Sequence, residues 1–117
     1  MCLDRLEKFP VRKNADGWIV AWKVFEKRGD YLKFPSRKAK SFSVGSRVHR
    51  AQGGIIGISP TYQSGYHAYK TRAEAFGGPY VFGSIRRVLL KDITATGYQN
   101  GLRVIVARKM IVPKEGR

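Results

Sequence analysis

Residues 84–112 read SIRRVLLKDITATGYQNGLRVIVARKMIV, which is two apolar-rich runs joined around Asn100-Gly101. An Asn-Gly pair between two such runs is a strong signal for a β-hairpin, because a type I′ turn needs positive φ at both central positions. We therefore expect residues 88–98 to pair with residues 102–112 and to form the rigid base of the domain. The residues of this hairpin that we expect to be buried are Ile93, Val104, Val106 and Met110.

The rest of the chain also shows mainly the pattern of strands. Residues 18–25 (WIVAWKVF) are β-branched and aromatic, and the turn signal Asn14-Ala15-Asp16-Gly17 precedes them. A second turn is expected at residues 28–30, before another short strand that Pro35 ends. The further expected strands lie at residues 31–34, 41–44, 47–49 and 66–69, with the second and third of these forming a hairpin around Gly45-Ser46.

One short helix is expected after the last of these strands. Thr71-Arg72-Ala73-Glu74 matches the capping-box pattern of a helix start, and Gly77-Gly78-Pro79 ends the helix soon afterwards. Residues 50–65 are rich in glycine and are expected to form a long mobile loop, with Ile55, Ile56 and Ile58 seeking burial. The sequence thus predicts a mainly β (α+β) fold in one domain, residues 1–117, as a curved antiparallel sheet or small barrel with one short helix.

Charge is the strongest functional signal. The chain has 23 Lys and Arg against 8 Asp and Glu, a formal net charge of +15, and no carboxylate occurs in the 43 residues between Asp30 and Glu74. Like charges that lie close together weaken a compact state, so such a segment is retained more easily when an anion neutralises it. Phosphate-bearing ligands are the expected partners of this segment.

The expected binding surface combines cations that hold phosphates with aromatic rings that stack on bases and with histidines. A small nucleotide held in a concave pocket and a short stretch of nucleic acid held on an open stripe both remain candidates. The residues predicted to bind phosphate or ligand are Arg37, Lys38, Lys40, Arg47, His49, Arg50, Tyr62, Tyr66, His67, Tyr69, Lys70 and Arg72.

A second class of function is a small ribonuclease or toxin-like enzyme. His49 and His67 are the two histidines of the chain, and such a pair can act as the base and the acid in RNA cleavage. A histidine within the strand-like YHAY is more often a half-buried structural residue or a ligand contact than a catalytic group. We therefore predict no catalytic residues and a non-enzymatic protein.

Several other classes of protein do not fit the composition. The single cysteine, Cys2, excludes an internal disulfide, and too few carboxylates are clustered for a carboxylate metal site or a paired-carboxylate hydrolase. We expect neither a metal nor another cofactor. No apolar stretch approaches the roughly 20 residues needed to cross a bilayer, and no signal-peptide segment opens the chain, so a cytoplasmic protein without a membrane partner is expected.

Several short motifs occur in a characteristic order along the chain. They are Met1-Cys2-Leu3, Trp22-Lys23-Val24-Phe25, GYHAYKTRAEA (residues 65–75), and the closing runs VLLKDITATG and VIVARKMIV. This layout resembles small uncharacterised proteins of phage and prophage genomes over most of the chain, with residues 33–60 the least similar. The family has no settled activity, so the resemblance assigns no role to individual residues.

The resemblance implies a context for the predicted binding. Small phage proteins often act by sequestering a host immune signal, by occupying a host protein or by coating nucleic acid. The resemblance therefore implies a counter-defence binding protein in the host cytoplasm that captures a nucleotide immune signal or nucleic acid. A homo-oligomer is also compatible with this expectation. The third class of function is an inhibitor of a host defence protein, which would carry exposed apolar anchors such as Ile55, Ile56, Phe76 or Tyr80 beside the charge.

Overall fold

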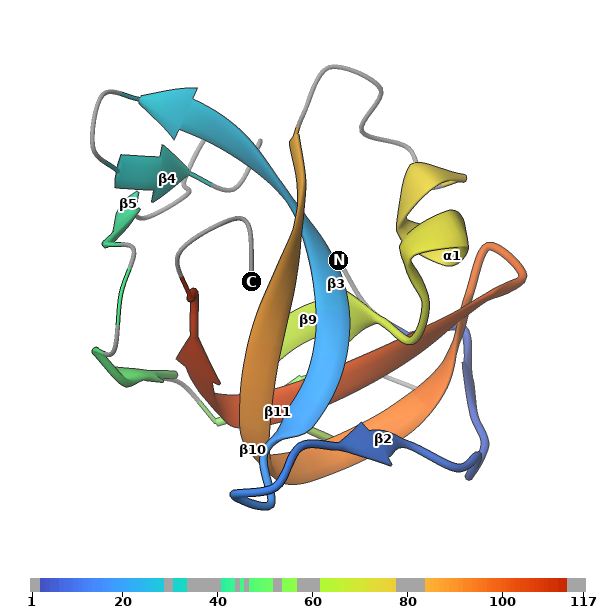
Figure 1. The fold of residues 1–117 in the computed structure, drawn as a ribbon. Coiled ribbons are helices and arrows are strands. Elements are labelled where there is room, and N and C mark those ends of the chain that lie inside the picture. Colours follow the sequence, from blue (N-terminus) through green and yellow to red (C-terminus); the bar gives the residue numbers. More distant parts are fainter. Residues whose placement is uncertain are drawn as a thin grey trace.

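The computed structural model describes residues 3–28, 31–33, 41–43, 45, 47–51, 54–56, 62–77 and 84–113. Nine strands form one antiparallel sheet, and two more form a separate small pair. One short helix, α1 (Arg72–Phe76), completes the described elements (Figure 1). The strands are β1 (Arg5–Leu6), β2 (Arg12–Lys13), β3 (Ile19–Arg28), β4 (Tyr31–Lys33), β5 (Ser41–Ser43), β6 (His49–Arg50), β7 (Ile55–Ile56), β8 (Tyr62–Gln63), β9 (Tyr66–Tyr69), β10 (Ser84–Gln99) and β11 (Leu102–Ile111).

The hairpin of β10 and β11 is confirmed. Asn100 and Gly101 have φ values of 53° and 78°, which are the two positive values that the predicted turn requires. Pairing runs from Gln99 opposite Leu102 to Leu89 opposite Ile111, with one irregularity between Ile93 and Ala95. At that irregularity β10 carries one extra residue, and Asp92 beside it has a φ of 60°.

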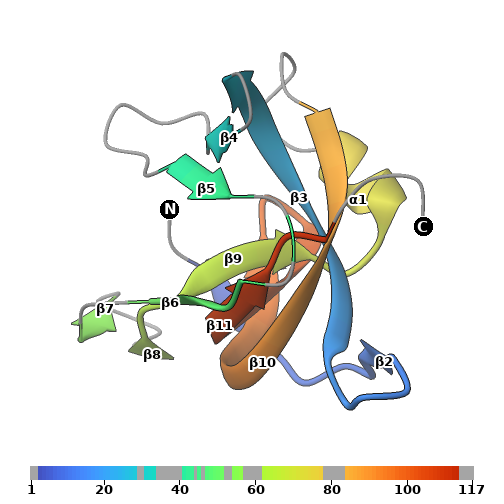
Figure 2. The ribbon, with the colours of Figure 1, turned by 60° about the vertical axis from the view of Figure 1, so that its left-hand side comes forward.

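The sheet closes on itself to form a small barrel. β10 pairs with β11 along one edge and, through residues 84–90, with β3 along the other. β11 pairs with β9, and β9 reaches β3 through the pair Tyr69 and Trp22, so four strands complete a ring. The curved strands of this ring are visible in Figure 2, where β3 and β10 lie side by side. The predicted fold class is confirmed.

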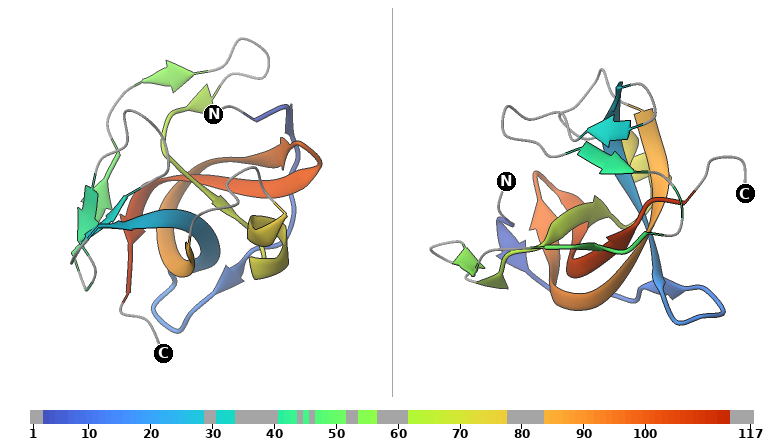
Figure 3. Two further views of the ribbon diagram at one scale, coloured as in Figure 1. Left: turned by 90° about the horizontal axis from the view of Figure 1, so that it is seen from above. Right: turned by 90° about the vertical axis from the view of Figure 1, so that its left-hand side faces the viewer.

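Both faces of the central strands are buried. Inside the ring lie side chains that include Phe25, Val88, Leu90 and Ile105. The outer face of β11 is covered as well, because Val104 and Val106 pack with Leu3 and with Ala75 of the helix. The helix α1 packs against β3, β9 and β10 and lies outside the curved sheet (Figure 3).

Three of the four hairpin residues expected in the core are buried there. Val104, Val106 and Met110 are at most 1 % exposed. The prediction for Ile93 is wrong, because this side chain is 39 % exposed. Ile93 lies at the irregularity of β10, where the strand bends and the regular alternation of inward and outward side chains is lost.

Two other local expectations are corrected. The segments around Gly45 do not pair with each other, because β5 pairs with β4 while β6 pairs with β11. The stretch 50–65 is not simply a loop, since it contains the strand pair of β7 and β8. Some residues named above lie outside what the structure describes, namely Pro35, Ile58, Gly78, Pro79 and Tyr80. For Ile55 and Ile56 the structure describes the backbone and not the side chains.

The capping box is confirmed at its threonine. The hydroxyl of Thr71 accepts a hydrogen bond from the backbone N–H of Glu74 at 3.1 Å and donates one to its carboxylate at 2.8 Å. The Glu74 carboxylate also binds the guanidinium and the backbone N–H of Arg103 on β11, with distances of 2.7–3.2 Å. These bonds hold the pKa of Glu74 below its ordinary value against the opposing effect of burial, and they fix the helix to the barrel.

Within the described residues, no helix is long and apolar enough to cross a bilayer.

Candidate functional site

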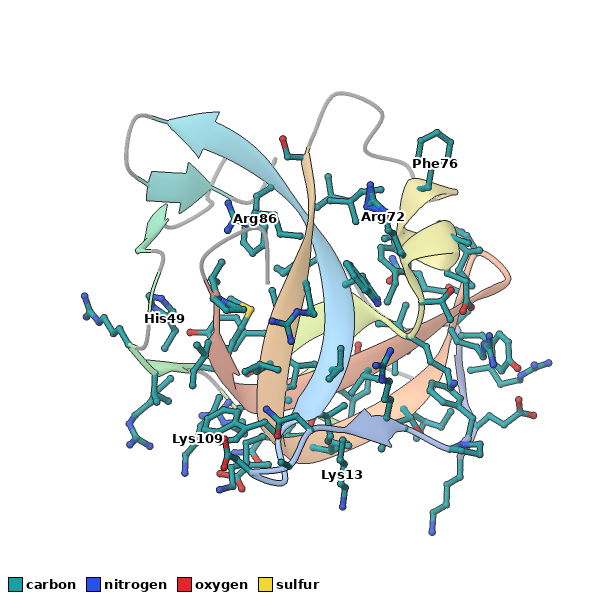
Figure 4. The ribbon with its side chains drawn as sticks, viewed as in Figure 1. Lys13, His49, Arg72, Phe76, Arg86 and Lys109 are labelled. Atoms are coloured by element: carbon teal, nitrogen blue, oxygen red, sulfur yellow. The ribbon has the colours of Figure 1, made fainter. Side chains whose placement is uncertain are left out.

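The structure separates the predicted binding residues into two groups. Arg47, His49 and Arg50 lie at β6, whereas Lys70 and Arg72 lie at the start of α1. Figure 4 shows His49 and Arg72 on opposite sides of the barrel. Arg37, Lys38 and Lys40 lie outside the described residues.

Tyr62 and His67 form a partly buried chain of hydrogen bonds with two backbone groups. The backbone N–H of Leu3 donates to the Tyr62 hydroxyl at 2.8 Å, and this hydroxyl lies 3.1 Å from Nε2 of His67. Nδ1 of His67 lies 3.2 Å from the Gly65 carbonyl, which can only accept. Nδ1 therefore carries the proton and Nε2 accepts from Tyr62, so every member of the chain is satisfied.

This chain gives His67 a structural role. Burial, aided by the nearby charge of Lys23, lowers the pKa of His67 to about 4, so its imidazole is neutral at pH 7. Both of its ring nitrogens are engaged within the protein. Tyr62 and Tyr69 are each 5 % exposed, so their rings are covered by protein, and we remove both from the predicted stacking surface.

The two histidines are also far apart for joint acid–base chemistry. His67 lies opposite Val106 of β11, and His49 lies opposite Met110 of the same strand. Four residues of strand span about 13 Å. A proton donor and a proton acceptor of one reaction need to lie within hydrogen-bond reach of the same substrate atoms.

Three cations lie side by side on the sheet, and we call them the cationic row: Arg50 of β6, Lys109 of β11 and Lys91 of β10. Lys109 is directly opposite Arg50 on one side and directly opposite Lys91 on the other. Directly opposed residues in antiparallel strands project from the same face with Cβ atoms about 4.5–5.5 Å apart. Like charges in such positions repel, so the row costs stability unless anions offset it.

One carboxylate contacts this row among the described residues. The Asp92 carboxylate lies 2.9 Å from Nζ of Lys109. The hydrogen bond from Lys109 is the main reason that the pKa of Asp92 lies below its ordinary value, and the charges of Lys109, Lys91 and Arg50 lower it further. One negative charge among three positive charges leaves the row with a net charge of about +2.

An aromatic ring lies at one end of the row. Nζ of Lys91 is 5.2 Å from the ring centre of Trp18, in a cation–π contact. Arg50 and Lys91 are exposed, and the side chain of Lys109 is 31 % exposed, so an anion in solvent can reach all three. Figure 4 shows Lys109 near the lower end of the barrel.

The remaining predicted residues near β6 and β9 serve the fold. Tyr66 packs against the interior of the ring, and burial raises its pKa while the charge of Arg108 lowers it. Arg108 donates to the carbonyls of Ser64 at 2.7 Å and Ala51 at 2.9 Å, so it fixes the two segments that precede β9 and follow β6.

A second exposed surface lies at α1. Phe76 is 81 % exposed, and the guanidinium of Arg72 lies 6.0 Å from the ring centre of Trp22. Arg87 is directly opposite Trp22 on the paired strand and so projects from the same face. This surface matches the apolar anchor beside positive charge that the third class of function predicts at Phe76.

The described residues contain no group of three or more His, Cys, Asp or Glu side chains placed to hold a metal ion.

Comparison with protein families, curated proteins and solved structures finds no match.

Lys91, Lys109 and Trp18 are the members of this site that the sequence did not reveal. Lys91 and Lys109 lie outside the acid-poor segment, and Asp92 beside Lys91 masks the local charge. Arg50 joins them only through the pairing of β6 with β11, which links residues 59 positions apart at Arg50 and Lys109. The hairpin signal alone does not place Lys91 opposite Lys109, because a regular register counted from Asn100-Gly101 places Met110 there.

Proposed function

We propose that this protein is a non-enzymatic binding protein for a phosphate-bearing polymer, namely nucleic acid, which it contacts through the cationic row. The observation that carries the proposal is the direct register of Arg50, Lys109 and Lys91 across three strands. The three adjacent cations repel one another in the isolated protein, and one contacting carboxylate offsets only part of this repulsion. A bound chain of phosphates would neutralise the remaining charge.

The shape of the row favours a polymer over a small nucleotide. The row crosses three strands about 4.8 Å apart, so it spans about 10 Å on an open face of the sheet. Phosphates of one strand recur about every 3.4 Å along the axis of a duplex, so a row of this length can contact more than one phosphate of a polymer. The net charge of +15 adds a long-range attraction that draws a polyanion to the protein.

The first test replaces two cations of the row. The double variant Lys91→Gln and Arg50→Gln is expected to bind a 20-nucleotide strand about 30-fold more weakly, from roughly 1 kcal/mol for each exposed phosphate contact. The slope of log affinity against log salt should become shallower by about 1.5, because two fewer counterions are released. Fluorescence anisotropy across a series of salt concentrations measures both quantities.

Two further variants control this test. Arg5→Gln removes a cation at the far end of the hairpin, since Arg5 lies opposite Tyr98, seven residues or about 23 Å along β10 from Lys91. Its effect on affinity should be much smaller. Asp92→Asn should strengthen binding about threefold, because it removes one exposed negative charge and asparagine tolerates the positive φ. Equal affinity in the double variant and the wild type would contradict the proposal.

The enzyme alternative predicts turnover that depends on His67. We expect labelled RNA incubated with the wild-type protein to remain intact, because the imidazole is neutral and both its nitrogens are engaged. His67→Asn should lower stability without changing any RNA product. Cleavage products that form with the wild type and vanish in His67→Asn would overturn the non-enzymatic assignment.

A protein partner is the second candidate function, and the exposure of Phe76 beside Arg72 favours it. An aromatic side chain next to arginine is typical of the residues that dominate protein interfaces. A host protein that binds the wild type and the double row variant, but not Phe76→Ser, would support this function over nucleic-acid binding.

The biological setting rests on the resemblance to small phage proteins. On that basis we propose that the binding of nucleic acid serves counter-defence.

A further inference from the structure

An apolar groove opens between the N-terminal segment and β10. Its volume is about 570 Å³, and its walls are residues 6–9 and 11 on one side and 93–96 on the other. Leu6, Phe9, Val11 and Ile93 are the large apolar residues of its lining. This volume is in the range of ordinary small-molecule sites.

Both walls of the groove are fixed by hydrogen bonds. The backbone N–H of Glu7 donates to the Thr96 carbonyl at 3.0 Å, and the Thr96 hydroxyl donates to the Glu7 carbonyl at 2.7 Å. The Thr94 hydroxyl donates to the Gln63 carbonyl at 2.7 Å. The groove is thus formed before any ligand arrives, which lowers the entropy cost of binding.

Three departures from ordinary structure coincide at this groove. Leu6 and Ile93 are 45 % and 39 % exposed, and they are two of the three exposed large hydrophobic side chains among the described residues. Asp92 has a φ of 60°, and β10 is irregular between Ile93 and Ala95. Departures of this kind persist most often where a binding site needs them.

The groove adjoins the cationic row. Ile93 follows Asp92, whose carboxylate lies 2.9 Å from Lys109, and Lys91 is two residues before Ile93 on the same strand. Lys8 adds a cation to the opposite wall. An occupant of this region therefore meets an apolar cleft with an aromatic ring, Phe9, next to a line of positive charge.

We propose that the groove receives an unpaired base of a nucleic-acid strand whose phosphates lie on the cationic row, so that the protein selects single strands over duplexes. This inference rests on the proposed function and adds the form of its ligand. A base presents a flat apolar surface attached to a phosphate chain, which matches a groove beside a cationic row. In a duplex the bases are stacked and paired, and one must be unpaired before it can enter.

The test compares one oligonucleotide as a single strand and as a duplex. The wild type is expected to bind the single strand at least tenfold more tightly than the duplex at the same salt. The double variant Leu6→Ser and Ile93→Ser should lose about tenfold in affinity for the single strand and keep its affinity for the duplex. Both side chains are substantially exposed, so the variant is expected to fold, which its melting temperature checks.

Phe76→Ser is the matched control, because it replaces an even more exposed hydrophobic side chain away from the groove and should bind both forms as the wild type does. A strand that contains 2-aminopurine gives a second measurement, since its emission should change with the wild type and not with the groove variant.

The outcomes separate the two proposals. If the groove variant binds single strands as the wild type does, while the Lys91→Gln and Arg50→Gln variant binds both forms weakly, the groove inference fails and the proposed function stands. If the row variant also binds normally, the proposed function itself fails. A mononucleotide that binds as tightly as the oligonucleotide would overturn the assignment to single strands.

Discussion

Raising the pH from 7 to 9 is expected to increase the free energy of unfolding by about 2–3 kcal/mol through one residue, Lys23. Its side chain is 5 % exposed, and its Nζ donates to the His67 carbonyl at 2.6 Å. Burial lowers the pKa of this amine to about 7, whereas the unfolded chain has the ordinary value near 10.5.

The direction follows from which state holds the proton. Below pH 7 the amine is charged in both the folded and the unfolded chain. The contribution of Lys23 to the free energy of unfolding is therefore lowest in this range. Between pH 7 and 10.5 the unfolded chain keeps the proton and the folded chain releases it, so stability rises with pH. Above pH 10.5 both states are neutral and the contribution is constant.

Urea unfolding at pH 7, 8 and 9 measures this effect, in a range below the ordinary pKa values of tyrosine and the other lysines. Lys23→Met keeps the length and apolar stem of the side chain and should remove most of the rise. Lys13→Met, at an exposed lysine, should retain it. A wild-type stability that stays constant from pH 7 to 9 would show that Lys23 is charged in the folded protein.

Replacement of Gly97 by alanine is expected to destabilise the protein by about 3 kcal/mol and to detach β1 from the sheet. A Cβ atom at this position would overlap the carbonyl oxygen of Arg5 and lie 3.0 Å from its carbonyl carbon. Both are backbone atoms, so no side-chain rotation relieves the overlap. Since Leu6 pairs with Gly97, the strand must move away, and the hydrogen bond from Leu3 to Tyr62 nearby is strained with it.

Gly54→Ala is the matched control, because a Cβ atom there meets nothing within 4 Å. Thermal unfolding compares the two variants, and amide hydrogen exchange at residues 4–7 reports the detachment of β1. Wild-type protection of these amides in Gly97→Ala would show that the sheet absorbs the methyl group elsewhere.

Local signals in the sequence were sufficient to predict the hairpin at the base of the fold and the start of the helix. Asn100-Gly101 predicted the turn with its two positive φ angles, and Thr71 with Glu74 predicted the start of the helix. Both patterns act within a few residues, so the chain carries them regardless of its tertiary context.

The position of Lys91 opposite Lys109 depends on a feature that the sequence does not show. A regular hairpin that starts with Gln99 opposite Leu102 would place Lys91 opposite Met110. The extra residue between Ile93 and Ala95 shifts the register by one and brings the two lysines together. The same irregularity exposes Ile93, so one bend accounts for both the missed lysine pair and the wrong core assignment.

The separation of the predicted site has a different cause. Arg50 and Arg72 lie in one acid-poor segment, but β6 and α1 join the barrel at different places. Nearness along the chain says little about nearness in a sheet whose neighbouring strands come from distant segments. The burial of Lys23 is equally unexpected, because lysine is rarely a core residue.

The closure of the ring dictates the order in which the chain can fold. Residues 5 and 6 pair with residues 97 and 98, and residues 19–25 pair with residues 84–90. During synthesis β1, and the edge of β3 that pairs with β10, therefore have no partner strand until most of the chain has been made, although β3 can already pair with β2 and β4. The hairpin of β10 and β11 is the most extensive local pairing of the chain, and the ring cannot close until it has formed. Such a topology predicts slow folding, and it makes the apolar segment 18–25 the part of a nascent chain most in need of protection from aggregation.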